Sequence, residues 1–313
     1  MRIAIVGAGG VGGYYGALLS RAGQEVWFLA RGEHLREMQA KGLEVKSVFG
    51  DFIVSPLRMT NDPKKIGAVD LVLFCTKTYD TDEAANCIIP LVGKQTSVMS
   101  LQNGVDAAER VGSVLGTQHI LGGTTWISSA IERPGVIRQM SDFRRIVLGE
   151  LDGNPSQRAE TVYQTLSSTG ITVELSRNIL QVLWTKFVFI AAVSAMGSLT
   201  RLPLGDYRAV PEARELATRL MDEVVAVGRA EGVTIEGDVV QQTLAFIDKA
   251  APQIKPSMQV DVENGRRTEL ESLIGVIGRR GRRAGVSTPA TDMVYAVLLP
   301  LEIKARESHN RGE

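Results

Sequence analysis

The spacing of apolar and polar positions changes near the middle of the chain. In the first part, short apolar runs predict strands at residues 3–6, 25–30, 69–76, 96–101 and 120–130, and a helical period follows the first run at 11–22. The third run is continuously apolar, which is typical of a parallel strand covered on both faces. Strands that alternate with helices indicate a doubly wound α/β sheet.

The first part of the chain ends with two more predicted strands, at 135–139 and 145–150, which are expected to pair antiparallel near a sheet edge. Helical periodicity dominates the second part. After Val173 the pattern predicts helices, separated mostly by Gly or Pro, at 178–195, 211–231, 238–250, 267–284 and 289–306. We therefore predict an α/β domain over residues 1–175 and an all-helical domain over residues 176–313.

Composition narrows the classes of function. The 313 residues are long enough for two domains, and 35 basic residues balance 35 acidic ones. This balance does not favour nucleic acid or an anionic membrane as a partner. The two cysteines fit no zinc spacing, and the three histidines are scattered, so no metal is expected. No later run reaches the roughly 20 apolar residues of a membrane span, and we expect a cytoplasmic protein.

A glycine motif directly follows the first predicted strand and opens the first helix. This position is typical of the G-x-G-x-x-G fingerprint of a dinucleotide-binding, Rossmann-type domain. The first glycine permits a tight turn, the second admits the pyrophosphate and the third lets helix and strand pack closely. The helix N-terminus attracts the phosphates. A glycine-rich turn without a ligand is the alternative. The predicted cofactor contacts are Gly7, Ala8, Gly9, Gly10, Val11 and Gly12.

The end of the second strand indicates which dinucleotide binds. NAD enzymes usually carry an acidic residue there, which bonds the ribose 2′-hydroxyl. This chain has Ala30-Arg31 instead, and a guanidinium pairs well with a 2′-phosphate. We therefore favour NADP over NAD. The nearby Glu33 keeps NAD as an alternative, and an exposed surface arginine is the simpler interpretation of Arg31.

Four further polar residues are candidates for chemistry. Lys77 and Asn103 follow predicted strands at their carboxyl ends, where ligands of doubly wound sheets lie, although a loop-capping role explains them equally well. Lys186 lies in an apolar helical stretch, so it is either a lysine whose stem covers apolar surface or a desolvated proton donor. Glu269 lies beside Arg266 and Arg267, where a surface ion pair is the simpler interpretation.

Together these motifs resemble the ketopantoate reductase (2-dehydropantoate 2-reductase) family over nearly the whole chain. The family has the glycine motif, an arginine after the second strand, a lysine after the fourth, an Asn-Gly pair after the fifth, and a Leu-Trp-x-Lys-Phe signature. The matching residues are Gly7 to Gly12, Arg31, Lys77, Asn103-Gly104 and 183–187, followed by 256–261 and 266–269. The resemblance implies NADPH-dependent reduction of ketopantoate to pantoate, in pantothenate biosynthesis.

The resemblance also implies roles for individual residues. Lys186 is the general acid that protonates the developing alkoxide, and Glu269 holds the substrate hydroxyl or tunes the lysine. Ser257 bonds the substrate carboxylate, and Ser194 is a further substrate contact. Asn103 positions substrate against the nicotinamide. Lys77 binds the cofactor at the entrance of the same site.

The chain departs from the family pattern at three positions where family members often have asparagine, namely Ile190, Ser194 and Ile254. Two of these replacements are apolar. Losing an amide removes polar contacts from a substrate pocket, so a more apolar, branched 2-oxo acid is the alternative substrate. A non-catalytic NADP(H)-binding sensor is the alternative from another class. The long helices after Pro211 could bury a homodimer face as readily as an intramolecular one.

Overall fold

The chain folds into two compact units in the computed structural model, which describes residues 1–311 and the side chains of residues 1–308. The first unit contains Met1–Gln102 and Ala107–Ile179. The second begins with the short segment Asn103–Asp106 and continues from Leu180. Contacts thus assign the Asn103 segment to the second unit, although it follows a strand of the first. The exact boundary near residue 175 stays a prediction.

The first unit is built on an eight-stranded sheet with the order β12-β11-β8-β7-β6-β1-β2-β5. All neighbours pair in parallel except β11 and β8, which are antiparallel. The carboxyl ends of β1, β6 and β7 therefore meet at one edge. The strands are β1 Arg2–Val6, β2 Glu25–Leu29, β5 Arg58–Thr60, β6 Leu71–Phe74, β7 Ser97–Ser100, β8 Ile120–Trp126, β11 Arg145–Gly149 and β12 Thr172–Leu175.

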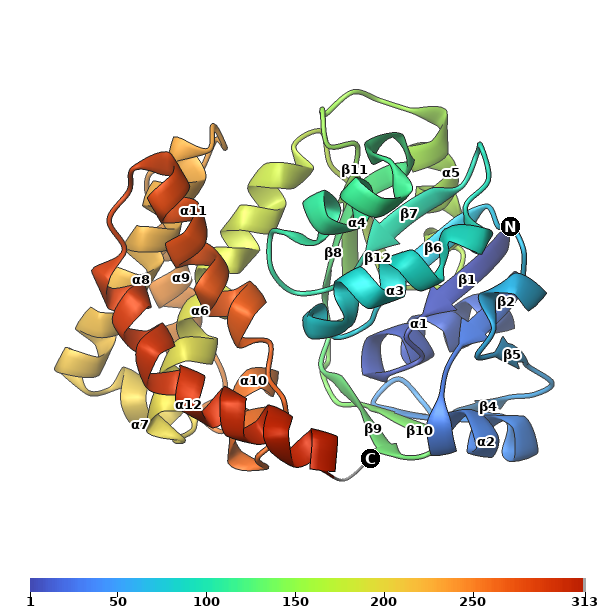
Figure 1. The fold of residues 1–313 in the computed structure, drawn as a ribbon, viewed down its shortest axis with the longest axis horizontal. Helices are drawn as coiled ribbons and strands as arrows, with labels where there is room; N and C mark the ends of the chain where they lie inside the picture. Colours follow the sequence, from blue (N-terminus) through green and yellow to red (C-terminus); the bar gives the residue numbers. More distant parts are fainter. Residues whose placement is uncertain (312–313) are drawn as a thin grey trace. The chain divides into compact units, whose positions relative to one another are not determined.

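Alternate residues of each central strand supply two separate cores. Ile3 and Ile5 of β1 pack with α1 (Gly10–Arg21) and α5 (Gln157–Ser167), whereas Ala4 and Val6 pack with α3 (Thr81–Cys87) and α4 (Ala107–Leu115). Side chains of a strand point to opposite faces in turn, so helices cover both faces of the sheet (Figure 1). This confirms the predicted Rossmann-type doubly wound fold.

A second, four-stranded sheet of the first unit was not predicted. Its order is β4-β3-β10-β9, with β10 parallel to β3 and antiparallel to β9. The prediction that residues 135–139 pair with 145–150 is wrong, because β10 and β11 belong to different sheets. The single predicted strand at 120–130 is also wrong, since the chain leaves one sheet and enters the other there. The strands are β3 Leu43–Ser47, β4 Phe52–Val54, β9 Ser129–Arg133 and β10 Val136–Gln139.

Short helices complete the first unit. The α-helix α2 begins beside the end of β2, with Arg31 as its N-cap residue, and ends at Gly42, which has a φ of +80°. Such a conformation favours glycine. The remaining elements are α2 Gly32–Lys41 and the 3₁₀ turns η1 Pro63–Lys65, η2 Thr78–Asp80, η3 Ile89–Leu91 and η4 Thr117–His119.

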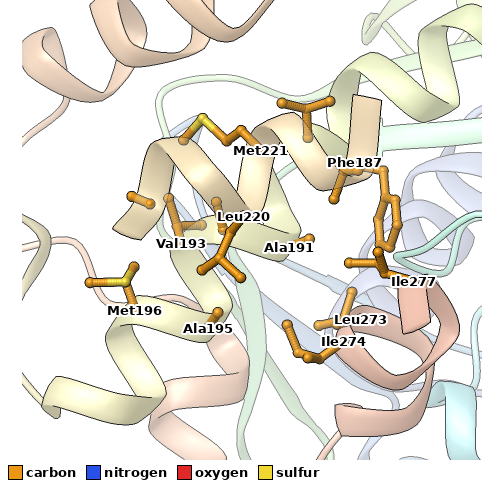
Figure 2. Close-up of a cluster of buried hydrophobic side chains, with 14 of the residues drawn as sticks. Phe187, Ala191, Val193, Ala195, Met196, Leu220, Met221, Leu273, Ile274 and Ile277 are labelled. Carbon is orange, nitrogen blue, oxygen red and sulfur yellow. The ribbon is translucent and has the colours of Figure 1, made fainter. Parts of the chain in front are cut away.

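The second unit is all-helical, as predicted, and its core surrounds the helix α6. Side chains of α6, α8, η5 and α11 interdigitate in this core (Figure 2). Two short helices, α7 and α10, were not predicted, and the predicted helix 267–284 begins with a π-helical turn, η5. The elements are α6 Ile179–Thr200, α7 Leu204–Arg208, α8 Pro211–Ala230, α9 Val239–Lys249, α10 Ser257–Glu263, η5 Glu271–Gly275, α11 Val276–Ala284 and α12 Pro289–Arg311.

The helix α6 corrects one expectation from the sequence. With 22 residues and a mean hydropathy of 1.8 over its most apolar window, it is long and apolar enough to cross a membrane. The sequence analysis did not single it out. In the structure, 56% of that window is buried inside the protein, and Phe187, Val188, Ala191 and Met196 belong to the core of the second unit. A core helix meets the same criteria of length and composition.

Candidate active site

The glycine motif forms the turn between β1 and α1. Gly7 has a φ of +93°, which a residue with a side chain rarely adopts. A Cβ on Gly12 would overlap the Gly7 carbonyl oxygen and lie 2.9 Å from Ile5 Cγ2, so helix and strand need a glycine there to pack this closely. A Cβ on Gly9 would meet nothing within 4 Å. The loop therefore has an open side at Gly9, where a dinucleotide pyrophosphate fits, and the first N–H groups of α1 lie next to it.

Two basic residues follow strands whose carboxyl ends lie at this edge of the sheet. Arg31 is 79% exposed, and its Nη2 lies 3.0 Å from Oδ2 of Asp80. Lys77 is half-buried and occupies the N-cap position of η2, shortly after β6, without a side-chain capping hydrogen bond. Asp80 was not singled out from the sequence, and it competes with any phosphate for Arg31.

Gln102 is a buried side chain of this edge that the sequence analysis missed. Its Nε2 donates to the Thr76 carbonyl at 3.0 Å and to Thr81 Oγ1 at 2.9 Å, and its Oε1 accepts from Ser100 Oγ at 3.1 Å. These bonds fix the loop that carries Lys77. The one signal in the sequence was the position of this glutamine, directly after an apolar strand and directly before the Asn103-Gly104 pair.

Lys186 and Asn103 lie together in the second unit. Lys186 Nζ donates to Asn103 Oδ1 at 3.0 Å, although the two residues are far apart in sequence. Burial lowers the pKa of the Lys186 ammonium to about 8, and the negative charge of Glu269 partly opposes this shift. An ammonium with this pKa is a good proton donor near neutral pH. Of the residues predicted from the sequence, the structure thus brings Lys186, Asn103 and Glu269 together.

Glu269 is only 5% exposed and lies just before the π-helical turn η5. Such turns are frequent at functional sites. The preceding residue, Thr268, is held by Glu302 of α12, whose Oε2 accepts from Thr268 N at 2.7 Å and from Thr268 Oγ1 at 2.6 Å. Glu302 also accepts from Arg306 Nε at 2.6 Å. The sequence analysis missed Glu302, although an acid in the apolar stretch 298–303 was a usable signal.

Replacing Glu302 with glutamine is expected to lower the free energy of unfolding by about 1.5–3 kcal/mol, because hydrogen bonds to a buried carboxylate are lost. Activity should fall as well, since Thr268 and Glu269 lose their support. Chemical denaturation of Glu302→Gln measures the loss. The exposed Glu212→Gln of α8 is the control, and equal stability of the two variants would contradict the assigned role.

The predicted substrate serines have different surroundings. Ser194 lies two helical turns after Lys186 on α6 and is 1% exposed, and its hydroxyl has no hydrogen-bond partner among the described residues. Ser257 is exposed in the first turn of α10. Ile190 is half-buried one turn after Lys186, and Ile254 is 42% exposed. No group of three or more His, Cys, Asp or Glu side chains that could hold a metal ion occurs in the described part of the chain.

Comparison with known proteins identifies the family of this chain. Residues 3–153 match the family "Ketopantoate reductase PanE/ApbA", and residues 178–302 match its C-terminal domain. The chain belongs to the ketopantoate reductase family. Its members are pyridine-nucleotide-dependent oxidoreductases that act on a CH–OH group of small acids.

Individual relatives align over almost their whole length. The "uncharacterized oxidoreductase YkpB" of Bacillus subtilis is 30% identical, with 95% of this chain and 98% of the relative covered. A 2-dehydropantoate 2-reductase of Mesorhizobium japonicum is 29% identical, with coverage of 97% and 98%. The crystal structure of a PanE/ApbA family ketopantoate reductase from Ralstonia eutropha JMP134 superimposes with a TM-score of 0.90 at 32% identity, covering 98% of this chain and all of that one.

Proposed function

We propose that this protein is a 2-dehydropantoate 2-reductase, which reduces ketopantoate to pantoate with NADPH. The observation that carries the proposal is the lysine site of the second unit. Lys186 Nζ is bonded to Asn103 Oδ1, its pKa is lowered to about 8 by burial, and Glu269 lies close by. A structural lysine on the surface of a helix would keep its ordinary pKa near 10.4.

Each residue of the site has a separate role in the proposed reaction. When bound, NADPH supplies the hydride for the ketone carbon. The Lys186 ammonium donates a proton to the carbonyl oxygen as negative charge develops there, and its positive charge stabilises that oxygen. Asn103 Oδ1 orients the ammonium. The carboxylate of Glu269 favours the protonated form of Lys186. Ser257 and Ser194 are proposed to bind the polar groups of the substrate.

Oxidation of NADPH by the purified protein with ketopantoate tests the proposal. Other 2-oxo acids, and NADH in place of NADPH, are assayed in parallel. Turnover that is efficient with ketopantoate and selective for NADPH is the expected result. NADPH binding without turnover of any 2-oxo acid would contradict the proposal and favour a sensor.

A more apolar 2-oxo acid is the second candidate substrate. Ile190 and Ile254 present hydrocarbon where family members often have an amide, and Ile190 lies one turn from Lys186 on α6. A site without these amides loses polar discrimination for a substrate hydroxyl. Turnover with a branched, hydroxyl-free 2-oxo acid that exceeds turnover with ketopantoate would select this alternative and leave the mechanism unchanged.

NADP is the proposed cofactor because Arg31, rather than an acid, follows β2. Arg31→Ala is expected to raise KM for NADPH about 10- to 100-fold, as loss of a charge-assisted pair implies, with little change in KM for NADH. Steady-state kinetics with both cofactors measure this. The exposed Arg58→Ala of β5 is the control. Equal effects of Arg31→Ala on both cofactors would contradict a role in binding the 2′-phosphate.

A cytoplasmic location and a homodimer stay predictions. The burial of α6 in the core of the second unit argues against this helix as a membrane span.

A further inference from the structure

His34 of α2 contacts two backbone groups that lie far apart in the sequence. Its Nε2 lies 2.9 Å from the carbonyl oxygen of Ala8 in the glycine loop, and its Nδ1 lies 3.1 Å from the amide nitrogen of Gly135. The Gly135 N–H can only donate, so Nδ1 accepts and Nε2 carries the ring proton, which it donates to Ala8. A single neutral tautomer of the imidazole therefore satisfies both contacts.

The four-stranded sheet supports the glycine loop in two ways, through His34 and through a direct contact with the first turn of α1. Gly135 lies in the turn between β9 and β10 of that sheet and has a φ of +77°. At the start of β9, Ser129 lies so close to the first turn of α1 that a Cβ on Gly10 would overlap its carbonyl group. The loop that we assign to the dinucleotide phosphates is thus held by the small sheet directly at Gly10 and through His34 at Ala8.

We propose that His34 is a positioning residue for the dinucleotide: its neutral imidazole holds the glycine loop in the binding conformation, and protonation at Nδ1 breaks the bond to Gly135 and weakens cofactor binding. The imidazolium has a donor at both ring nitrogens, so Nδ1–H would face the Gly135 N–H. The inference rests on the proposed dinucleotide site at Gly7 to Gly12 and adds a pH dependence to it.

The direction of the pH effect follows from the surroundings of the ring. Burial lowers the pKa of His34 below its ordinary value, and the hydrogen bond to Ala8 partly opposes this. The neutral form therefore dominates at and above the ordinary value of about 6.5. The affinity for the dinucleotide that the two His34 hydrogen bonds contribute is therefore present at those pH values. It is lost as the pH falls through the lowered pKa of His34. Phosphates of a bound dinucleotide act in the opposite direction, because they favour the imidazolium.

Charged groups on the neighbouring elements are mostly paired with one another. On α2, Glu37 accepts from Lys41 at 2.7 Å, and Glu33 is exposed in the first turn. In the small sheet, Arg133 of β9 pairs with Glu44 of β3. The strand β5, which packs against α2, carries the exposed Arg58, and the glycine loop has no titratable side chain. Among these groups, His34 is thus the one whose ordinary pKa lies near neutral pH.

The dissociation constant of NADPH, measured by calorimetry from about pH 5.5 to about pH 8 across the range where histidine titrates, tests the inference. His34→Gln keeps a donor for Ala8 but does not titrate. Affinity of the unaltered protein should fall more steeply on acidification than that of His34→Gln. At the highest pH of this range, His34→Ala should bind NADPH roughly 3- to 10-fold more weakly, as the loss of such hydrogen bonds implies, with kcat at saturating NADPH unchanged.

His119→Gln is the matched control. His119 is also half-buried in the first unit and bonds one backbone carbonyl, that of Thr96 at 2.9 Å, but Thr96 precedes β7, at the opposite end of that strand from the ligand edge. Titration of the NADPH phosphate itself affects every variant equally. Parallel pH curves for the unaltered protein and His34→Gln would overturn the inference. No NADPH binding by the unaltered protein at any pH would overturn the proposed function, and the inference with it.

Discussion

Lys186→Ala is expected to lower kcat for 2-oxo acid reduction by a factor of about 10²–10⁴, the usual contribution of a positioned general acid. The dissociation constant of NADPH should not change, because the glycine loop belongs to the first unit and Lys186 to the second. Steady-state kinetics and a binding titration measure the two quantities separately. Lys249→Ala, at the exposed end of α9, is the control and should retain full activity.

The pH profile of the unaltered enzyme checks the same role. The pKa of Lys186 is lowered to about 8, and the proton donor must be charged to act. Activity in the direction of reduction should therefore hold near neutral pH and fall as the pH rises through about 8. Unchanged turnover in Lys186→Ala, or a profile that stays flat to the ordinary lysine pKa of about 10.4, would remove Lys186 from the mechanism.

Gly12→Ala and Gly9→Ala should both weaken dinucleotide binding, but for different physical reasons. The methyl group of Gly12→Ala would overlap the Gly7 carbonyl oxygen, so α1 must move away from β1, at a cost of about 1–3 kcal/mol in the free energy of unfolding. Thermal denaturation and NADPH titration of Gly12→Ala should both show a loss.

Gly9→Ala is the matched comparison. A Cβ at Gly9 meets no protein atom within 4 Å, and its φ of −75° suits alanine. This variant should keep its melting temperature and lose NADPH affinity by about tenfold or more, which corresponds to roughly 1.4 kcal/mol of binding energy. If Gly9→Ala binds NADPH normally, the pyrophosphate does not lie where the open side of the loop suggests.

Features encoded by neighbouring residues were predicted correctly, whereas strand pairing, which depends on residues far apart in the sequence, was not. Each central strand was placed to within a few residues, because a buried strand is an apolar run. The strand at 120–130 was predicted as one piece, since both halves share the same apolar composition. Residues 135–139 and 145–150 were assigned to each other because they are neighbours in the sequence. Instead, β10 pairs with β3 and β11 pairs with β8, and both of these partners lie earlier in the chain, separated from β10 and β11 by other elements.

The candidate site shows the same division. Lys186 was selected because a lysine in an apolar helix is unusual, and the sequence left open whether it is buried or extends to water. Only the structure places Asn103 Oδ1 3.0 Å from its ammonium. Glu302, Gln102 and His34 were not selected, because each acts through backbone or hydroxyl groups distant in sequence.

Local sequence signals were enough to specify the glycine turn between β1 and α1, the alternation that builds the doubly wound sheet, and the change to helices after Val173. These features depend on local backbone freedom and on the period of apolar residues, which neighbouring positions encode. The pairing of the strands, the polar groups that meet at Lys186 and the side chains that support the glycine loop become visible only in the folded protein. Those contacts join residues separated by tens of positions, and their energies depend on burial and distance, which no local pattern records.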